Sequence, residues 1–583
     1  MALHIACLIG GVRAVSTEVA EAAAVAPVAD DLLGAVPDDV GLCIEARNLH
    51  DHLRDFATGS MFARWKEYPP LAKLYAEQRV QLDRLSLHLK RNIGVSWDDL
   101  RSRLFGTQWV LGVYPPAEGK GPPDGFLLIR AADAELLARA AEKLVEANRA
   151  AERYRGTTSV TIGATTFTIH ELKADGDRSV YLARHDAFGV IATRSDVLDR
   201  ILKLRCGDRT GAIVESPEFI RGFGKLSADC TLRAFLRPRS WLPSDPPEIV
   251  EGSDVASNAD RLRMLNTGKA LTFASAGLSL GAAPRLEMYV GWDAERLPAP
   301  FDALARCFPA SNAASPTIPA AALAAVALNV DLRGVTTAVV DGLLQSYAER
   351  GKSLPAEVVV ASRLIGALGP GLRGYATRAA KPSDDTARLP VDWVVALDTQ
   401  SPAEGHVSLA ETFDPAARLA LVLAADAYNA RSPQKARLET LTLDSSSVTG
   451  LTNFGPQGIG RVFLMRRAGR LLVGGSPESL RWGGDERATA VSDAGSQSFA
   501  ALHDRRFERP AATAFVHVAQ IRSLLNDLLT DPPTWLGEPR DDDQAKLLEL
   551  ISLLSLVDGA LLEAAIDAEG AAAALAIGLD ERP

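Results

Sequence analysis

The chain contains 583 residues, too many for one compact core when a domain usually holds about 100–200 residues. Hydrophobic residues make up 47% and charged residues 23%, as in ordinary globular proteins, so the composition excludes a disordered or fibrous chain. Lys and Arg number 63 against 73 Asp and Glu, and the net charge of −10 argues against a dedicated nucleic-acid-binding protein. We therefore expect two or more folded domains and no nucleic-acid partner.

The first 30 residues have features of a degenerate or truncated secretory signal. Residues 1–12 are apolar, and Ala24–Ala26 suits the small-residue rule of signal peptidase. Against this, no Lys or Arg precedes the apolar run and Arg13 follows it directly, so an ordered or frayed N-terminus is an equal alternative. A lipid-anchored Cys7 is disfavoured, because His4 stands where that signal has Leu. The segment predicts an extracytoplasmic protein, periplasmic or secreted, and a cytoplasmic protein if it is not a signal.

The cysteines and the apolar runs exclude two further classes. The five cysteines are far apart and never form a CxxC pair, so neither a zinc knuckle nor a disulfide framework is predicted. We expect most of them to be small buried apolar side chains: Cys7, Cys43, Cys206, Cys230 and Cys307. No window of about 18 uninterrupted apolar residues occurs, so no transmembrane span is predicted. Residues 546–557 are too short for one and contain Glu549, so a buried core helix is expected there.

An internal repeat is the most informative feature, because a long period determines the architecture before any local prediction is made. Residues 180–198 align without a gap with residues 462–480. Each stretch predicts a β-hairpin whose second strand leads into a short helix, opening at Ser195 or at Ser476-Pro477. Other apolar segments recur in the same order at similar offsets: 42–44 with 325–328, 109–114 with 372–375, 126–129 with 393–396, 234–237 with 514–517, and 270–293 with 557–580.

Duplication of an ancestral gene explains this shared order. The expected organisation is an N-terminal segment at 1–30, one copy at 31–295, a linker at 296–316 and a second copy at 317–583. Within the first copy, helical stripes alternate with short strands, the helices expected over 71–89 and 136–144 and the strands over 108–114, 159–163 and 166–172. The predicted fold class is α+β: two homologous copies, each an antiparallel or mixed sheet with helices packed on one face.

Four features carry a resemblance to a known family. They are the Pro-led openings at Val36-Pro37 and Ile318-Pro319, the Leu-rich helix after Pro69-Pro70, the strand 126–129 leading into the Ala-rich helix 133–149, and the unit at 180–198. In these features the chain is similar to the bacterial domain of unknown function 3352 family. The openings depart from the family's acidic-Thr pattern, with Asp38-Asp39 in one copy and Ala320-Ala321 in the other. The resemblance implies an extracytoplasmic protein without an established activity, and it supplies no catalytic residues.

One stretch matches the dinucleotide-binding fingerprint letter for letter, Gly369-Pro-Gly-Leu-Arg-Gly374. That fingerprint must follow a strand and open a helix. Here a predicted helix at 357–364 precedes it and Tyr375 begins or continues a strand, while the matching stretch of the first copy, 106–112, lacks the pattern. We therefore expect a turn.

Three other groups have a simpler structural interpretation. Asp541–Asp543 resembles a cation cluster, but it directly precedes a predicted helix at 544–557, which its carboxylates would cap. His50 and His52 begin a predicted helix at 49–56, where residues two apart diverge, so a shared metal is disfavoured. The stretch 237–243 combines two Arg, a Trp and two Pro, as binding surfaces do, but a Pro-bounded turn with Trp241 packed inward is favoured.

No HExxH, GxSxG or Walker motif occurs, and we assign no catalytic, cofactor-binding or metal-binding residue and expect no cofactor. The leading hypothesis is a non-enzymatic extracytoplasmic structural or interaction protein, with a protein or small molecule bound in the groove between the two halves. One alternative is a hydrolase-type enzyme whose site is assembled from distant residues of one half. Another is peptide binding by strand addition at a sheet edge.

Overall fold

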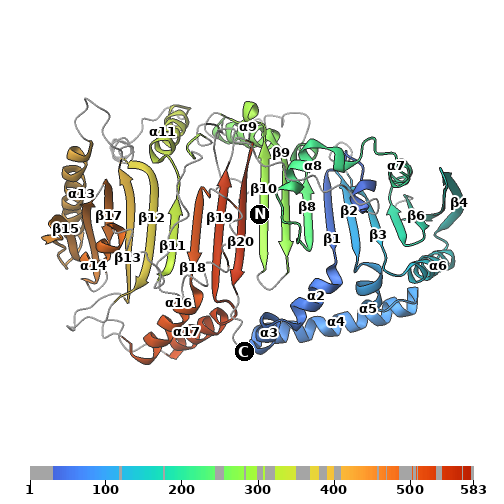
Figure 1. The fold of residues 1–583 in the computed structure, drawn as a ribbon, viewed down its shortest axis with the longest axis horizontal. Coiled ribbons are helices and arrows are strands. Elements are labelled where there is room, and N and C mark those ends of the chain that lie inside the picture. Colours follow the sequence, from blue (N-terminus) through green and yellow to red (C-terminus); the bar gives the residue numbers. More distant parts are fainter. Residues whose placement is uncertain are drawn as a thin grey trace. The chain divides into compact units, whose positions relative to one another are not determined.

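The computed structural model describes residues 31–116, 121–174, 178–242, 255–280, 284–298, 302, 306–308, 322–349, 368–379, 390–399, 409–455, 458–467, 469–484, 502, 507, 510–532, 541–566 and 569–578. These residues form two compact units, one within 16–297 and one within 298–582 (Figure 1). The N-terminal segment with Cys7, the opening at Ile318-Pro319, the predicted helix at 357–364 and most of the linker lie outside the described residues.

The unit within 16–297 is built on one antiparallel sheet. Its strand order is β4-β5-β6-β7-β3-β2-β1-β8-β9-β10, and every pairing is antiparallel. The strands are β1 (Leu42–Arg47), β2 (Gln108–Tyr114), β3 (Asp124–Arg130), β4 (Tyr154–Ile162), β5 (Thr165–Lys173), β6 (Ser179–His185), β7 (Phe188–Ala192), β8 (Leu232–Leu236), β9 (Leu271–Ser279) and β10 (Arg285–Trp292). The predicted α+β class with an antiparallel sheet is confirmed.

Helices cover both faces of this sheet, so the expectation of helices on one face is wrong for this unit. The helices are η1 (Leu32–Ala35), α2 (Leu49–Thr58), α3 (Ser60–Glu67), α4 (Pro69–Ile93), α5 (Trp97–Asp99), η2 (Leu100–Leu104), α6 (Ala134–Ala150), α7 (Ser195–Arg205), η5 (Ile213–Glu215), α8 (Pro217–Gly224), η6 (Pro238–Trp241), α9 (Val255–Ala270) and η7 (Ala294–Arg296). Leu182 packs with Ala141 and Val145 of α6. On the opposite face, Gly222 of α8 lies against Phe273. Strands β6 and β7 carry apolar residues on both sides, which explains the two covered faces.

The unit within 298–582 has the same strand order, β14-β15-β16-β17-β13-β12-β11-β18-β19-β20, again with every pairing antiparallel. Its strands are β11 (Ala322–Leu328), β12 (Leu368–Arg378), β13 (Val391–Thr399), β14 (Arg437–Leu443), β15 (Ser446–Phe454), β16 (Gly460–Arg467), β17 (Arg470–Gly474), β18 (Ala512–Val516), β19 (Gly559–Ile566) and β20 (Gly570–Gly578). Its helices are α11 (Leu332–Glu349), α13 (Leu409–Arg431), α14 (Pro477–Gly484), α16 (Val518–Thr530) and α17 (Asp541–Leu554).

The two segments on which the repeat was based adopt the predicted form. Strands β6 and β7 form a hairpin followed by α7, and β16 and β17 form a hairpin followed by α14. Ser476 caps α14, because its Oγ accepts a hydrogen bond of 3.0 Å from the backbone N–H of Ser479. Ser195, by contrast, is the first residue of α7 and Arg194 occupies the N-cap.

A buried ionic network joins three central strands of the first unit. The Glu45 side chain on β1 is 0% exposed and its Oε2 accepts bonds of 2.9 and 2.6 Å from the guanidinium of Arg233 on β8. Gln108 on β2 donates from Nε2 to Glu45 Oε1 and to Asp31 Oδ1, both at 2.7 Å, and Arg47 pairs with both carboxylates. Each oxygen of the buried carboxylate therefore has a donor, as a buried charge requires.

Two predicted apolar helices form, but they are not buried. The predicted helix at 71–89 is part of α4, and most of its leucines are exposed. Of the predicted core helix at 546–557, residues 546–554 belong to α17, where Leu548, Leu550 and Leu553 are exposed. Among the described residues, none of the helices has the length and apolar character needed to cross a membrane.

The described cysteines are all reduced. Cys43, Cys230 and Cys307 are buried, as expected from the sequence, while Cys206 is half-buried.

Candidate ligand-binding pocket

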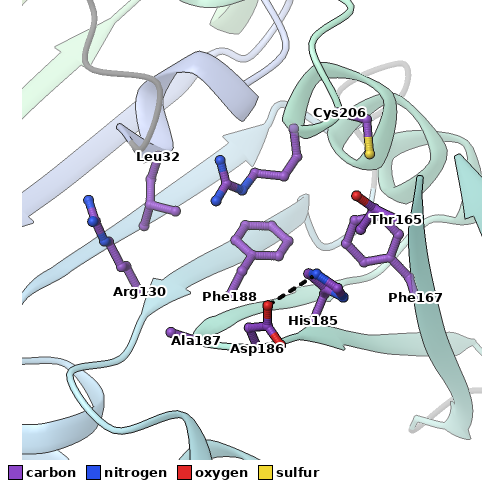
Figure 2. Close-up of a pocket in the computed structure, with 10 residues that line it drawn as sticks. Leu32, Arg130, Thr165, Phe167, His185, Asp186, Ala187, Phe188 and Cys206 are labelled. Carbon is purple, nitrogen blue, oxygen red and sulfur yellow. Dashed lines mark ion pairs between the residues drawn. The ribbon is translucent and has the colours of Figure 1, made fainter. Parts of the chain in front are cut away.

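A cavity of about 440 Å³ lies in the unit within 16–297, where the end of β3 meets the β6–β7 turn, the start of β5 and the end of α7 (Figure 2). Its lining mixes cations, two phenyl rings and small polar groups: Leu32, Arg130, Thr165, Phe167, His185, Asp186, Ala187, Phe188, Arg205 and Cys206.

The β6–β7 hairpin positions one side of the pocket. His185 and Phe188 are cross-strand partners, so their side chains lie on the same face of the hairpin. Asp186 in the turn has φ of 49°, in the left-handed region that Asp tolerates better than most residues. The Ala187 carbonyl accepts a hydrogen bond of 2.9 Å from the N–H of Ala131, which fixes the turn to the end of β3.

The charged groups of the pocket are mainly cationic. Arg130 ends β3 and pairs in register with Phe188, while Arg205 ends α7 and lies over the Phe188 ring at 5.5 Å from its centroid. His185 Nε2 lies 3.3 Å from Oδ2 of Asp186, the single carboxylate among the lining residues. The lining therefore holds two guanidinium groups, one imidazole and one carboxylate.

Two phenyl rings form the apolar wall of the pocket. Phe167 and Phe188 are both buried, and their centroids are 6.4 Å apart in an edge-to-face arrangement. The His185 ring lies 5.6 Å from that of Phe167. The two rings supply the apolar part of a lining whose exposed surface is mainly polar.

The pocket contains a thiol, an imidazole and a carboxylate, but they do not form a catalytic triad. A hydrolase of this kind needs a nucleophile hydrogen-bonded to a base that is itself oriented by a third group. Among the described residues, no hydrogen bond joins the Cys206 thiol to His185, and Asp186 is exposed. The arrangement suits binding better than covalent catalysis.

None of the four candidate sites weighed in the sequence, at 369–374, 541–543, 50–52 and 237–243, lines this pocket. Residues 369–374 lie inside strand β12, with a register irregularity between Leu368 and Leu372, so the expected turn is wrong. They open no helix, which a dinucleotide fingerprint requires. Residues 541–543 form the first turn of α17 instead of preceding it, and no group of three or more candidate metal ligands occurs among the described residues.

His50 and His52 lie in the first turn of α2, as predicted. The stretch from Arg237 forms the short helix η6, but Trp241 is exposed, so the expectation that it packs inward is wrong. Pro243 lies outside the described residues.

Few features of the sequence indicate the pocket residues. Arg130 and Arg205 are single cations at the ends of elements, and only the hairpin between His185 and Phe188 was predicted. Their convergence depends on β3 pairing with β7, a contact between distant parts of the chain.

A second cavity, of about 380 Å³, lies in the unit within 298–582 and is lined by Cys307, Asp331 and Asp302 among others. Burial and then the nearby Asp331 carboxylate raise the pKa of the Cys307 thiol to about 11, so the thiol is protonated and unreactive at neutral pH. This cavity offers acidic groups and no activated nucleophile.

The fold and the pocket together define an α+β protein with an antiparallel sheet and a cationic cavity. Comparisons of the chain with protein-family models, with curated proteins and with solved structures give no significant match.

Proposed function

We propose that this protein is a non-enzymatic binding protein, and that its pocket beside Arg130 and Arg205 holds a small anionic ligand with a flat apolar part. The observation that carries the proposal is the convergence of two guanidinium groups and two phenyl rings on one cavity of about 440 Å³. A planar guanidinium matches carboxylate or phosphate oxygens, and the rings supply a surface for an apolar ring or chain.

The proposal also includes two predictions from the sequence, the duplication of an ancestral gene and an extracytoplasmic location. The shared strand order of the two units supports descent from a duplicated gene, as do the buried Phe235 and Phe515 at the fourth position of β8 and β18. Membership of the domain of unknown function 3352 family and an extracytoplasmic location rest on the sequence resemblance. The groove between the two halves stays a prediction, because each unit is described by itself.

Calorimetric titration of the full chain with phenyl phosphate, benzoate and inorganic phosphate tests the pocket. We expect phenyl phosphate to bind more tightly than inorganic phosphate, because only the former uses the phenyl wall. Arg205→Gln should weaken phenyl phosphate binding at least tenfold through loss of a charge-assisted contact of about 1.5–3 kcal/mol. The matched control is Arg209→Gln, an exposed cation four residues further on. Equal binding by both variants, or no binding of any of the three anions by the wild type, would refute the assignment.

Peptide capture by strand addition is a second candidate function, favoured by the outer strands of the two sheets. Among the described residues, β4 pairs with β5 alone and β14 with β15 alone. The nine residues of β4 include one charged side chain, Arg155, and no Pro. Natural proteins usually block such an edge with charges or Pro, so an open edge indicates a place where another strand can pair.

Hydrogen exchange tests strand addition directly. A peptide with the sequence of residues 165–173, the natural partner of β4, is added to the full chain. Peptide capture would be supported if the peptide slows exchange of the β4 amides in the wild type but not in Thr158→Pro, because Pro removes a backbone N–H donor from the middle of the edge strand. Unchanged exchange of β4 in the wild type would refute it.

A further inference from the structure

The middle of helix α4 stands clear of the rest of its unit. Residues 73–85 are exposed without interruption, although the helix is 25 residues long. Near both ends the helix is attached to its unit: the Tyr75 ring lies 5.3 Å from the Phe62 ring of α3, and Ser86 Oγ accepts a hydrogen bond of 3.0 Å from the N–H of Trp97. Residues 76–85, between these contacts, are exposed, and so are Lys73 and Leu74 just before them.

The uncovered stretch carries an apolar stripe. Leu74, Leu82 and Leu85 are 51%, 38% and 40% exposed. At 3.6 residues per turn these positions fall within one side of the helix. Tyr75 and, on the adjoining α3, Trp65 are also exposed. An amphipathic helix of a globular protein normally buries such a stripe, so this exposed one is a candidate docking surface.

The charges on α4 identify the occupant as anionic. The helix holds five Lys or Arg and two Asp or Glu, a local charge of +3 in a chain whose net charge is −10. By helical geometry Lys73, Arg84 and Arg91 flank the stripe on one side, and Arg79 and Lys90 flank it on the other. All five are exposed, and among the described residues none of them is engaged in an ion pair.

We propose that α4 docks lengthwise on the surface of an anionic lipid bilayer. A helix of 25 residues is about 37 Å long and presents a convex stripe, which suits a plane better than a protein groove. Leucines would enter the boundary between headgroups and acyl chains, the flanking Lys and Arg would reach the lipid phosphates, and Tyr75 and Trp65 would lie at the interface. This surface is separate from the anion pocket and independent of the function proposed for it.

Co-sedimentation of the full chain with vesicles tests the proposal. The probes are vesicles of phosphatidylcholine alone and vesicles with 30% phosphatidylglycerol. We expect binding to the anionic vesicles, weakened by salt, and little binding to the neutral ones. The variant Arg84→Gln/Arg91→Gln replaces two of the flanking cations. Its partitioning into anionic vesicles should be about 30-fold weaker, because each cation near the membrane surface contributes about 1 kcal/mol.

A matched pair of variants separates the stripe from general hydrophobicity. Leu74→Asn/Leu82→Asn removes two leucines of the stripe, whereas Val80→Asn/Leu87→Asn removes two apolar residues that are at least as exposed, from the opposite side of the same helix. Only the first should abolish vesicle binding. Circular dichroism should show that both variants keep the fold, because all four positions are exposed.

Three outcomes would overturn the proposal: no binding of the wild type to anionic vesicles, equal binding to neutral ones, or equal loss in both double variants. If instead the wild type self-associates without binding vesicles, and Leu74→Asn/Leu82→Asn abolishes this self-association, the stripe binds a second copy of the chain. That result would also refute docking on lipid.

Discussion

The buried carboxylate of Glu45 predicts a large and specific loss of stability when its main cation is removed. In Arg233→Met the side chain stays long and unbranched, but the guanidinium is removed. Glu45, whose side chain is 0% exposed, then loses both hydrogen bonds at its Oε2. Breaking a buried pair by removing one partner costs about 3–5 kcal/mol, because an uncompensated charge stays behind. The remaining donors, Arg47 and Gln108, compensate part of this, so we expect about 3 kcal/mol.

Hydrogen exchange of the β1 and β2 amides in the full chain measures this loss within the affected unit. A loss of about 3 kcal/mol corresponds to roughly 150-fold faster exchange where exchange requires unfolding. Amides of β18 in the other unit provide an internal reference. A loss below about 1 kcal/mol in Arg233→Met would refute the view that this ion pair is essential to the sheet.

A double variant distinguishes the lost pair from the charge left behind. Arg233, the second residue of β8, pairs with Glu45 on β1. The second residue of β18 in the other unit is Thr513, and it pairs with Ala327 on β11. Glu45→Ala/Arg233→Thr copies that neutral pair and leaves no buried charge at these positions. It should recover at least about 1 kcal/mol relative to Arg233→Met. A double variant that is less stable than the single one would contradict this explanation.

Two further predictions concern single side chains. Burial lowers the pKa of His517 below its ordinary 6.5, and its Nδ1 accepts a hydrogen bond from the N–H of Gln520 at the start of α16. The unfolded state therefore binds the proton more readily, and the free energy of unfolding should fall as the pH drops below about 6.5. Between pH 7.5 and 5 the melting temperature should fall less in His517→Asn, which keeps a capping oxygen, than in the wild type, and an identical fall would contradict the assignment. A Cβ at Gly112 would lie 2.1 Å from the Phe126 ring, so Gly112→Ala should cost about 1–3 kcal/mol in urea unfolding, whereas Gly156→Ala, with nothing within 4 Å, should cost far less.

The sequence predicted the elements better than their packing. The predicted strand at 108–114 matches the bounds of β2, and turn chemistry located the hairpin at 180–192. These are local properties, determined by residues within a few positions of each other. The same is true of the start of α2 at Leu49.

Predictions failed where tertiary context decides. The glycines at 369–374 favour a turn locally, yet pairing with β13 draws them into a strand. The apolar stripe of α4 predicts burial, but nothing in a helical period says whether a partner is present in the chain. The pocket needs Arg130, Phe167 and Arg205 from three elements that meet only when β3 pairs with β7, and no spacing in the sequence encodes that meeting.

The ion pair between Glu45 and Arg233 also has a consequence for how the chain avoids misassembly. Two sheets with the same strand order offer each other interchangeable strands while folding, and exchange of this kind is a common failure of repeat proteins. If β18 took the place of β8 beside β1, Glu45 would face Thr513 and lose Arg233, the main cation beside it. As in Arg233→Met, that mismatch would cost about 3 kcal/mol, which would favour β8 over β18 beside β1.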